Sequence, residues 1–248
     1  HDSLIRMQRK TDIFSRTYSL NTGYEGGHRI GRGMLRWCAN ILYSNAKNRD
    51  NTFYSFSNPT LQGNNMYRDN FWDIPMQTAQ GELTFGYDIG HLGILDRIWA
   101  DYIYDCLWES VDSTLRTMNG TVMERDTLNS YTSTVLTQRH NLALNTKANL
   151  ESLLGIPVYA TLNLPLRFVS RDMDYRRLRL NNYHRNDILC EPSLELEYGG
   201  EHVFKLNLDL LSTLPPMLYC TPFRDTSNPL HILMGNTELD NARNLLLK

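Results

Sequence analysis

Residues 203–210, with the sequence VFKLNLDL, alternate apolar and polar side chains with a period of two. In an extended strand successive side chains point to opposite faces, so this pattern predicts a β-strand with one apolar and one polar face. The apolar positions are Phe204, Leu206, Leu208 and Leu210, and the polar ones are Lys205, Asn207 and Asp209.

The residues just before this segment predict its hairpin partner. Residues 190–198 carry the same alternation, and residues 199–202, Gly-Gly-Glu-His, have the composition of a tight turn. The apolar side consists of Cys190, Pro192, Leu194, Leu196 and Tyr198, set against Glu191, Ser193, Glu195 and Glu197. We therefore expect an antiparallel hairpin.

The same design recurs along the chain and predicts about eight strands. The other alternating runs are residues 18–25, 35–43, 82–89, 98–109, 130–147 and 158–168. Pro165 interrupts the last of these and cannot donate to a ladder, so a bulge or local break is expected there. Short connections (26–33, 91–93, 148–156, 199–202) alternate with long polar ones (45–75, 110–128, 170–187, 214–240). In an up-and-down sheet this places tight turns at one end and long loops at the other.

Composition excludes several classes of protein. A net charge of −2 in 248 residues lacks the basic excess that a nucleic-acid partner requires. No run of about 18 apolar residues is present, which excludes a transmembrane helix but not a membrane barrel. The four cysteines show no CxxC pair and the histidines no HxH or HExxH pattern, so we expect no metal site, no cofactor and no catalytic residues.

Two folds would bury such an apolar stripe: a secreted, soluble β-sandwich that acts as a binding module or adhesin, or a transmembrane barrel. Three features favour the barrel. Several runs approach the ~9–11 residues that cross a bilayer, aromatic residues lie near the run ends, and the polar face carries charges at mid-strand. The aromatic residues are Tyr18, Tyr24, Tyr43, Tyr87, Trp108, Phe168 and Tyr198. The charges are Asp101, Asp105, Arg167, Glu195, Lys205 and Asp209.

We therefore predict an all-β fold, an antiparallel up-and-down transmembrane β-barrel segment that forms an arc of a larger barrel. Its lipid-facing residues would be Leu35, Trp37, Ile41, Leu83, Phe85, Tyr102, Tyr104, Leu162, Leu164, Leu166, Leu194, Leu196, Phe204, Leu206 and Leu208.

The segment TPFRDTSNPLHILMGNTELDNARNLLLK, residues 221–248, resembles the late-barrel signature of TonB-dependent-receptor-like outer-membrane proteins of the Bacteroidota type. In that family an NPF/PYRD-x-x-NP stretch precedes GNPxLxPE and a new strand. The matching residues are Pro222, Phe223, Arg224, Asp225, Asn228, Pro229, Gly235, Asn236 and Leu239. Thr237 and Asn241-Ala242 stand where the family has Pro and Pro-Glu. Residues 16–33 and 128–144 also resemble mid-barrel strands of the family.

The resemblance implies a barrel of about 22 strands with a plugged lumen, in the cell outer membrane, that takes part in ligand uptake or surface binding without catalysis. Its partners would be outer-membrane lipid, an unknown ligand and, through a plug, the TonB energy-transducing complex; nucleic acid would not be one. We expect residues 1–248 to be a partial barrel domain without plug domain or signal peptide.

Two charged groups remain. The run Arg171, Asp172, Asp174, Arg176, Arg177 and Arg179 is expected to be a solvated loop, with contact to a ligand or lipopolysaccharide as the alternative. Glu195 and Glu197 share one side of a strand, which would permit acid–base chemistry, but solvation of an inward face is the expected role.

Overall fold

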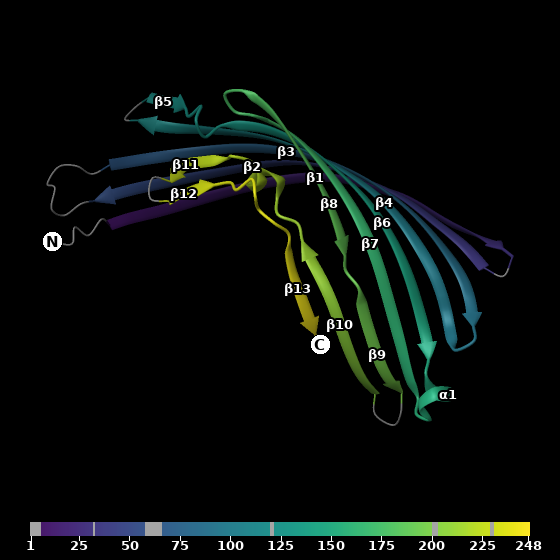
Figure 1. Ribbon diagram of the computed structural model, residues 1–248. Helices are drawn as coiled ribbons and strands as arrows, with labels where there is room; N and C mark the ends of the chain where they lie inside the picture. The colour runs from purple at the N-terminus through teal and green to yellow at the C-terminus, as the bar shows by residue number, and fades with distance from the viewer. Residues whose placement is uncertain (1–5, 32, 58–65, 120–121, 200–202, 229–230) are drawn as a thin grey trace.

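A computed structural model describes residues 6–31, 33–57, 66–119, 122–199, 203–228 and 231–248. Almost all of them lie in strands (Figure 1). The strands are β1 (Arg6–Ile30), β2 (Gly33–Ser57), β3 (Met66–Leu92), β4 (Leu95–Asn119), β5 (Val122–Arg125), β6 (Tyr131–Asn149), β7 (Val158–Arg176), β8 (Leu180–Cys190), β9 (Ser193–Gly199), β10 (Val203–Thr213), β11 (Arg224–Asn228), β12 (His231–Met234) and β13 (Ala242–Leu247). The helical elements are α1 (Glu151–Leu154) and the 3-10 turn η1 (Met217–Cys220). No helix among the described residues has the length and apolar character to cross a membrane.

The main sheet is antiparallel and runs up and down, as predicted. Its order is β1-β2-β3-β4-β6-β7-β9-β10-β13, with β5 beside β4 and β8 beside β7. Seven of the eight expected runs lie in strands of this sheet, one of them from its second residue, Tyr131. The eighth, 190–198, is continuous strand only from Ser193, and the hairpin forms between β9 and β10 with Leu206 opposite Leu196. The sheet is an open arc, because within the described part of the chain β1 and β13 stand at its two edges.

The predicted apolar residues share one face of the sheet. Directly opposed residues in neighbouring strands lie on the same face, as do alternate residues within a strand. One row of partners, Trp37, Phe85, Tyr102, Leu142 and Leu166, crosses β2, β3, β4, β6 and β7. The same register places all fifteen residues expected to face lipid on this side. We call it the outer face, and its apolar zone the apolar belt.

The outer face has no second layer over it in the described part of the structure. Phe204 is 66% exposed and Leu206 42% exposed, and none of the fifteen residues is buried. A β-sandwich would instead bury these side chains against an opposing sheet.

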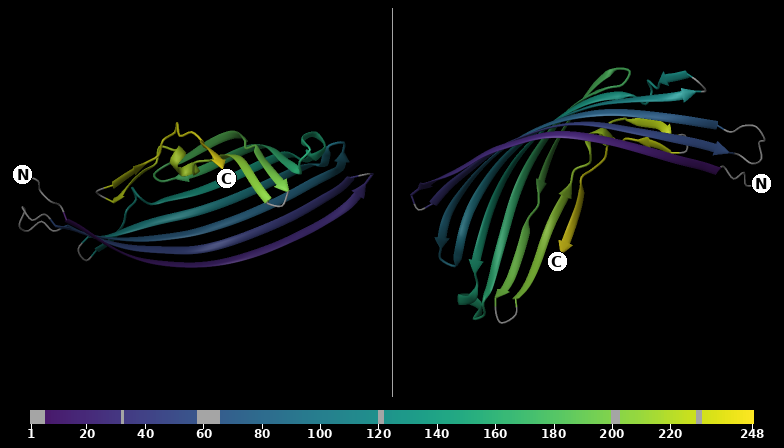
Figure 2. Two further views of the ribbon diagram at one scale, coloured as in Figure 1. Left: turned by 90° about the horizontal axis from the view of Figure 1, so that it is seen from below. Right: turned by 180° about the vertical axis from the view of Figure 1, so that it is seen from behind.

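The opposite, inner face is concave and partly covered. Figure 2 shows the yellow segment that contains η1, β11 and β12 lying over the concave side of the curved sheet. We call residues 214–241 the motif segment, because they contain most of the residues that resemble the receptor family.

The strands are longer than their alternation predicts. Residues 45–57 and 66–75 extend β2 and β3, residues 110–119 extend β4, and residues 180–187 belong to β8, so these parts of the expected long loops are paired strand. The apolar belt therefore occupies only the part of the sheet nearest the short turns. Beyond it the outer face of β4 and β7 is mainly polar, with Ser110, Asp112, Thr114, Asp172 and Asp174.

The bulge or break expected at Pro165 is absent from its own strand. β7 is continuous through Pro165, which faces Ala143 of β6. On the other side of β7 the ladder stops between Cys190 and Ser193, where β8 ends and β9 begins. Pro165 offers no N–H on that side, and its carbonyl accepts only a long hydrogen bond, 3.5 Å, from the N–H of Glu191.

Candidate functional site

The motif segment packs onto the inner face through an aromatic and methionine core. Met173 and Tyr175 of β7 and Met217 and Phe223 of the motif segment form one buried cluster. The ring of Tyr131 lies 5.5 Å from that of Tyr175 and 6.0 Å, edge-on, from that of Phe223. Removal of these apolar side chains from water stabilises the packing of the motif segment against β6 and β7.

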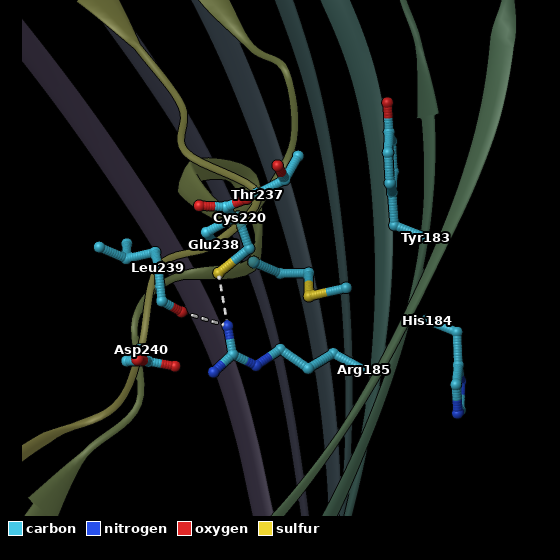
Figure 3. Close-up of a pocket in the computed structure, with 9 residues that line it drawn as sticks. Tyr183, His184, Arg185, Cys220, Thr237, Glu238, Leu239 and Asp240 are labelled. Carbon is cyan, nitrogen blue, oxygen red and sulfur yellow. Dashed lines mark hydrogen bonds between the residues drawn. The ribbon is translucent and has the colours of Figure 1, made fainter.

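A buried charged network ties the same segment to β7 and β8. Arg171 donates from Nη2 to Asp187 Oδ2 at 2.9 Å and from Nη1 to the carbonyl of Pro215 at 2.6 Å. Arg185 donates from Nε to Asp187 and from Nη1 to the carbonyl of Leu239 at 2.6 Å, as Figure 3 shows for the second contact. Asn241 donates from Nδ2 to Asp187 Oδ1 at 2.9 Å and accepts from Arg185. We call Arg171, Arg185, Asp187 and Asn241 the anchor cluster.

The anchor cluster makes the docking of the motif segment specific. The side chains of Arg171 and Asp187 are 6% and 5% exposed, so neither charge has water as an alternative partner. The carbonyl of Pro215 accepts a further hydrogen bond from Arg171 and that of Leu239 one from Arg185, whereas Nε of Arg171 has no partner among the described residues. The motif segment thus supplies backbone acceptors for two arginines of the sheet, Arg171 of β7 and Arg185 of β8.

The residues of the family resemblance lie mainly within this docked segment. Phe223 is in its core, Arg224 and Asp225 begin β11 opposite Met234 and Leu233, and Leu239 accepts from Arg185. Asn236 donates its backbone N–H to the carbonyl of Tyr219. Asn228 pairs with His231 in the β11–β12 hairpin, Pro222 lines a cavity at the surface, and Pro229 lies outside the described residues.

Gly235 is required by close packing. Its N–H donates to the carbonyl of Phe223 at 2.7 Å, and a Cβ built on it would lie 2.0 Å from the carbonyl oxygen of Thr221. No other residue fits at this position without moving the backbone.

Burial raises the pKa of Tyr131, and the nearby side chains of Tyr175 and Asp225 add to the effect. Burial also raises the pKa of Tyr175, against the opposing influence of the Arg177 charge. Both residues lie beyond the apolar belt, near the long-loop end of the sheet. The neutral phenols are therefore the form that the packed segment favours.

The charged run at 171–179 is not the solvated loop that its composition predicts. Arg171 is buried in the anchor cluster, whereas Asp172 pairs with the exposed His184 on the outer face at 2.6 Å. The run divides because residues 171–176 belong to β7 and alternate between the two faces. The bend at 177–179 then contributes Arg177 and Arg179 to the rim of a cavity.

Several other charged residues of the inner face form ion pairs. Arg139 pairs with Asp105 at 2.8 Å and Arg167 with Glu191 at 3.0 Å. Glu195 and Glu197 share Lys205 at 3.6 and 3.3 Å, so both carboxylates serve this ion pair. No group of three potential metal ligands is found among the described residues.

The buried cluster of Met173, Tyr175, Met217 and Phe223 on the inner face was not predicted from the sequence, although the sequence of β7 contains a pattern that indicates it. Beyond Phe168 the alternation of β7 reverses its sense: Val169, Met173 and Tyr175 are buried on the inner face, while Asp172 and Asp174 face outward. A change of phase within one alternating strand indicates that the covered face has switched.

No family model matches the chain, and no curated protein matches it. Among solved structures, one that resembles it is the ferric yersiniabactin uptake receptor FyuA from Yersinia pestis, with 12% sequence identity and a TM-score of 0.39. The alignment covers 73% of this chain and 28% of that receptor, so the chain spans well under a third of the length of the structure it is compared with.

Proposed function

We propose that residues 1–248 form an arc of an outer-membrane β-barrel in a TonB-dependent-receptor-like protein that takes part in ligand uptake or surface binding and has no catalytic role. The apolar belt is the observation that carries this proposal. It is a continuous exposed zone across the strands, on the convex side of a sheet whose concave side is charged. Lipid is the environment in which such a face is stable.

The inner face supports a role in handling a ligand. Its paired charges suit an aqueous lumen, and the motif segment narrows that lumen from within (Figure 2). On this proposal the partners are outer-membrane lipid, a soluble ligand and, through a plug, the TonB complex, and the location is the cell outer membrane.

The experiment compares two neighbouring substitutions in the full-length protein. Leu206→Arg places a charge on the outer face and is expected to cost roughly 2–4 kcal/mol in folding into bilayers, because Leu206 lies within the apolar belt. Asn207→Arg, its matched control, lies on the inner face and should be tolerated. Unfolding in urea from lipid vesicles measures both, with heat-modifiable gel migration as the sign of a folded barrel.

The secreted, soluble binding module is the competing function. It would require the apolar belt to be covered by protein, and recovery of the full-length protein in the soluble fraction without detergent would favour it over the barrel. Equal tolerance of both arginine substitutions would likewise contradict the proposal.

A further inference from the structure

The long-loop end of the inner face contains a cationic cavity that the docking of the motif segment creates. Its volume is about 670 Å³. Its larger polar lining residues are Tyr175, Arg177, Arg179, Asn181, Tyr183 and Arg224, and Thr226 and three apolar residues complete the lining. The first five come from β7, β8 and the bend between them, and Arg224 comes from β11. The cavity thus exists only when the motif segment is in place.

Three guanidinium groups lie at this cavity, and the nearest carboxylate shown is Asp225, which helps to raise the pKa of Tyr175 but does not line the cavity. Arg177 donates from Nη1 to the carbonyl of Arg224 at 2.9 Å, which brings the two arginines together. No acidic residue lines the cavity, and within the described part of the chain Arg177, Arg179 and Arg224 have no ion pair. Like charges gathered at a partly enclosed surface are stabilised by a bound anion.

The wall adds a further unsatisfied donor. Tyr175 is 5% exposed, and its hydroxyl is without a hydrogen-bond partner among the described residues. A buried hydroxyl normally finds a partner in the folded state. A bound oxyanion would accept a hydrogen bond from this hydroxyl after a small side-chain adjustment.

We propose that this cavity, the arginine cavity, binds a small soluble ligand that carries two or more oxyanion groups. Guanidinium groups recognise carboxylate, sulfate and phosphate by paired hydrogen bonds, and three of them suit a ligand with more than one such group. The cavity lies on the face opposite the apolar belt, so a solute in the lumen reaches it and a lipid headgroup does not. The inference rests on the proposed function and names the class of ligand that the lumen would take.

The test is calorimetric titration of the full-length protein in detergent micelles with citrate, inorganic phosphate and sulfate, with glucose as the neutral comparison. We expect citrate, which carries three carboxylates, to bind more tightly than phosphate or sulfate, and glucose not to bind; tighter binding of either single-group anion would contradict the proposal. Arg179→Gln and Arg224→Gln should each weaken the tightest anion about tenfold, the usual effect of losing a charge-assisted hydrogen bond.

Arg176→Gln is the matched control. Arg176 neighbours Arg177 in sequence but belongs to the outer face, where it pairs in register with Leu180. It should leave anion affinity within about twofold of the parent. An equal loss in this variant, unchanged affinity in both cavity variants, or no binding of any anion by the parent would overturn the inference.

The outcome is separable from that of the proposed function. A protein that folds into the outer membrane yet binds no anion refutes the arginine cavity alone. A protein recovered in the soluble fraction refutes the barrel, whatever it binds.

Discussion

At the scale of single residues, two aspartates on neighbouring strands have different roles because they lie on opposite faces of the sheet. Asp172 on β7 and Asp187 on β8 each accept hydrogen bonds from a cationic or potentially cationic partner. Asp172 is 56% exposed on the outer face, whereas Asp187 is buried beneath the motif segment with two arginines and Asn241. Neither position is distinguished in the sequence, because both occur in polar runs. Their difference follows from which face each occupies.

We expect Asp187→Ala to destabilise the protein by about 3–5 kcal/mol, because it leaves Arg171 buried without its counter-charge and Arg185 without its acceptor. Urea unfolding from vesicles measures the loss, and limited proteolysis at the motif segment should show that it detaches first. Asp172→Ala is the control on the adjacent strand. It removes an exposed pair and should cost at most about 1 kcal/mol. Similar losses in the two variants would show that the anchor cluster does not hold the segment.

At the scale of elements, sequence alternation predicts strands well where their two faces differ. The eight runs and the 190–210 hairpin have a belt on one side and charges on the other, so period two is visible. Residues 45–57 are polar throughout most of their length and resemble a loop, although their backbone is fully paired with β1 and β3. Such pairing depends on neighbouring strands and leaves no amphipathic pattern. The motif segment was likewise not predictable as an inner layer, because its contacts join residues far apart in the chain.

Docking of the motif segment should be sensitive to alkaline pH. The pKa of Tyr131 and of Tyr175 is raised in the packed state, so the docked segment binds their protons more tightly than the released one. This stabilisation is fully present below the ordinary tyrosine pKa of about 10 and is lost as pH rises through the elevated pKa values. Tyrosinate absorbance and proteolysis of the segment, followed together across that range, should change in the same step. In a variant with Tyr131→Phe and Tyr175→Phe the step should disappear, and release at an unchanged pH would contradict the assignment.

At the scale of the whole molecule, the proposed barrel requires hydrogen-bond partners for both edge strands of the sheet. Among the described residues β1 has a partner on one side only, and so does β13. In hydrocarbon every backbone N–H and C=O needs a hydrogen-bond partner, so an open arc is not stable in a bilayer by itself. The proposal therefore requires both edges to be paired in the membrane, by further strands of the same barrel. Neighbouring β-strands of like twist and tilt would extend the apolar belt around the molecule.

Four tryptophans permit a direct test of which face meets lipid. Trp37 lies in the apolar belt, where its ring covers Gly26 of β1, and a Cβ on that glycine would lie 2.7 Å from the ring. Trp99 belongs to the inner face, opposite Asn145 and beneath the guanidinium of Arg97. In full-length protein reconstituted into vesicles of brominated lipid, a variant that keeps only Trp37 should lose most of its fluorescence, because bromine in the acyl chains reaches it. A variant that keeps only Trp99 should be quenched by aqueous iodide instead and little affected by bromine. If Trp99 is quenched by bromine and Trp37 by iodide, the charged face is the one in the membrane. If neither tryptophan is quenched by bromine, the apolar belt is covered by protein. Either result would exclude the proposed barrel.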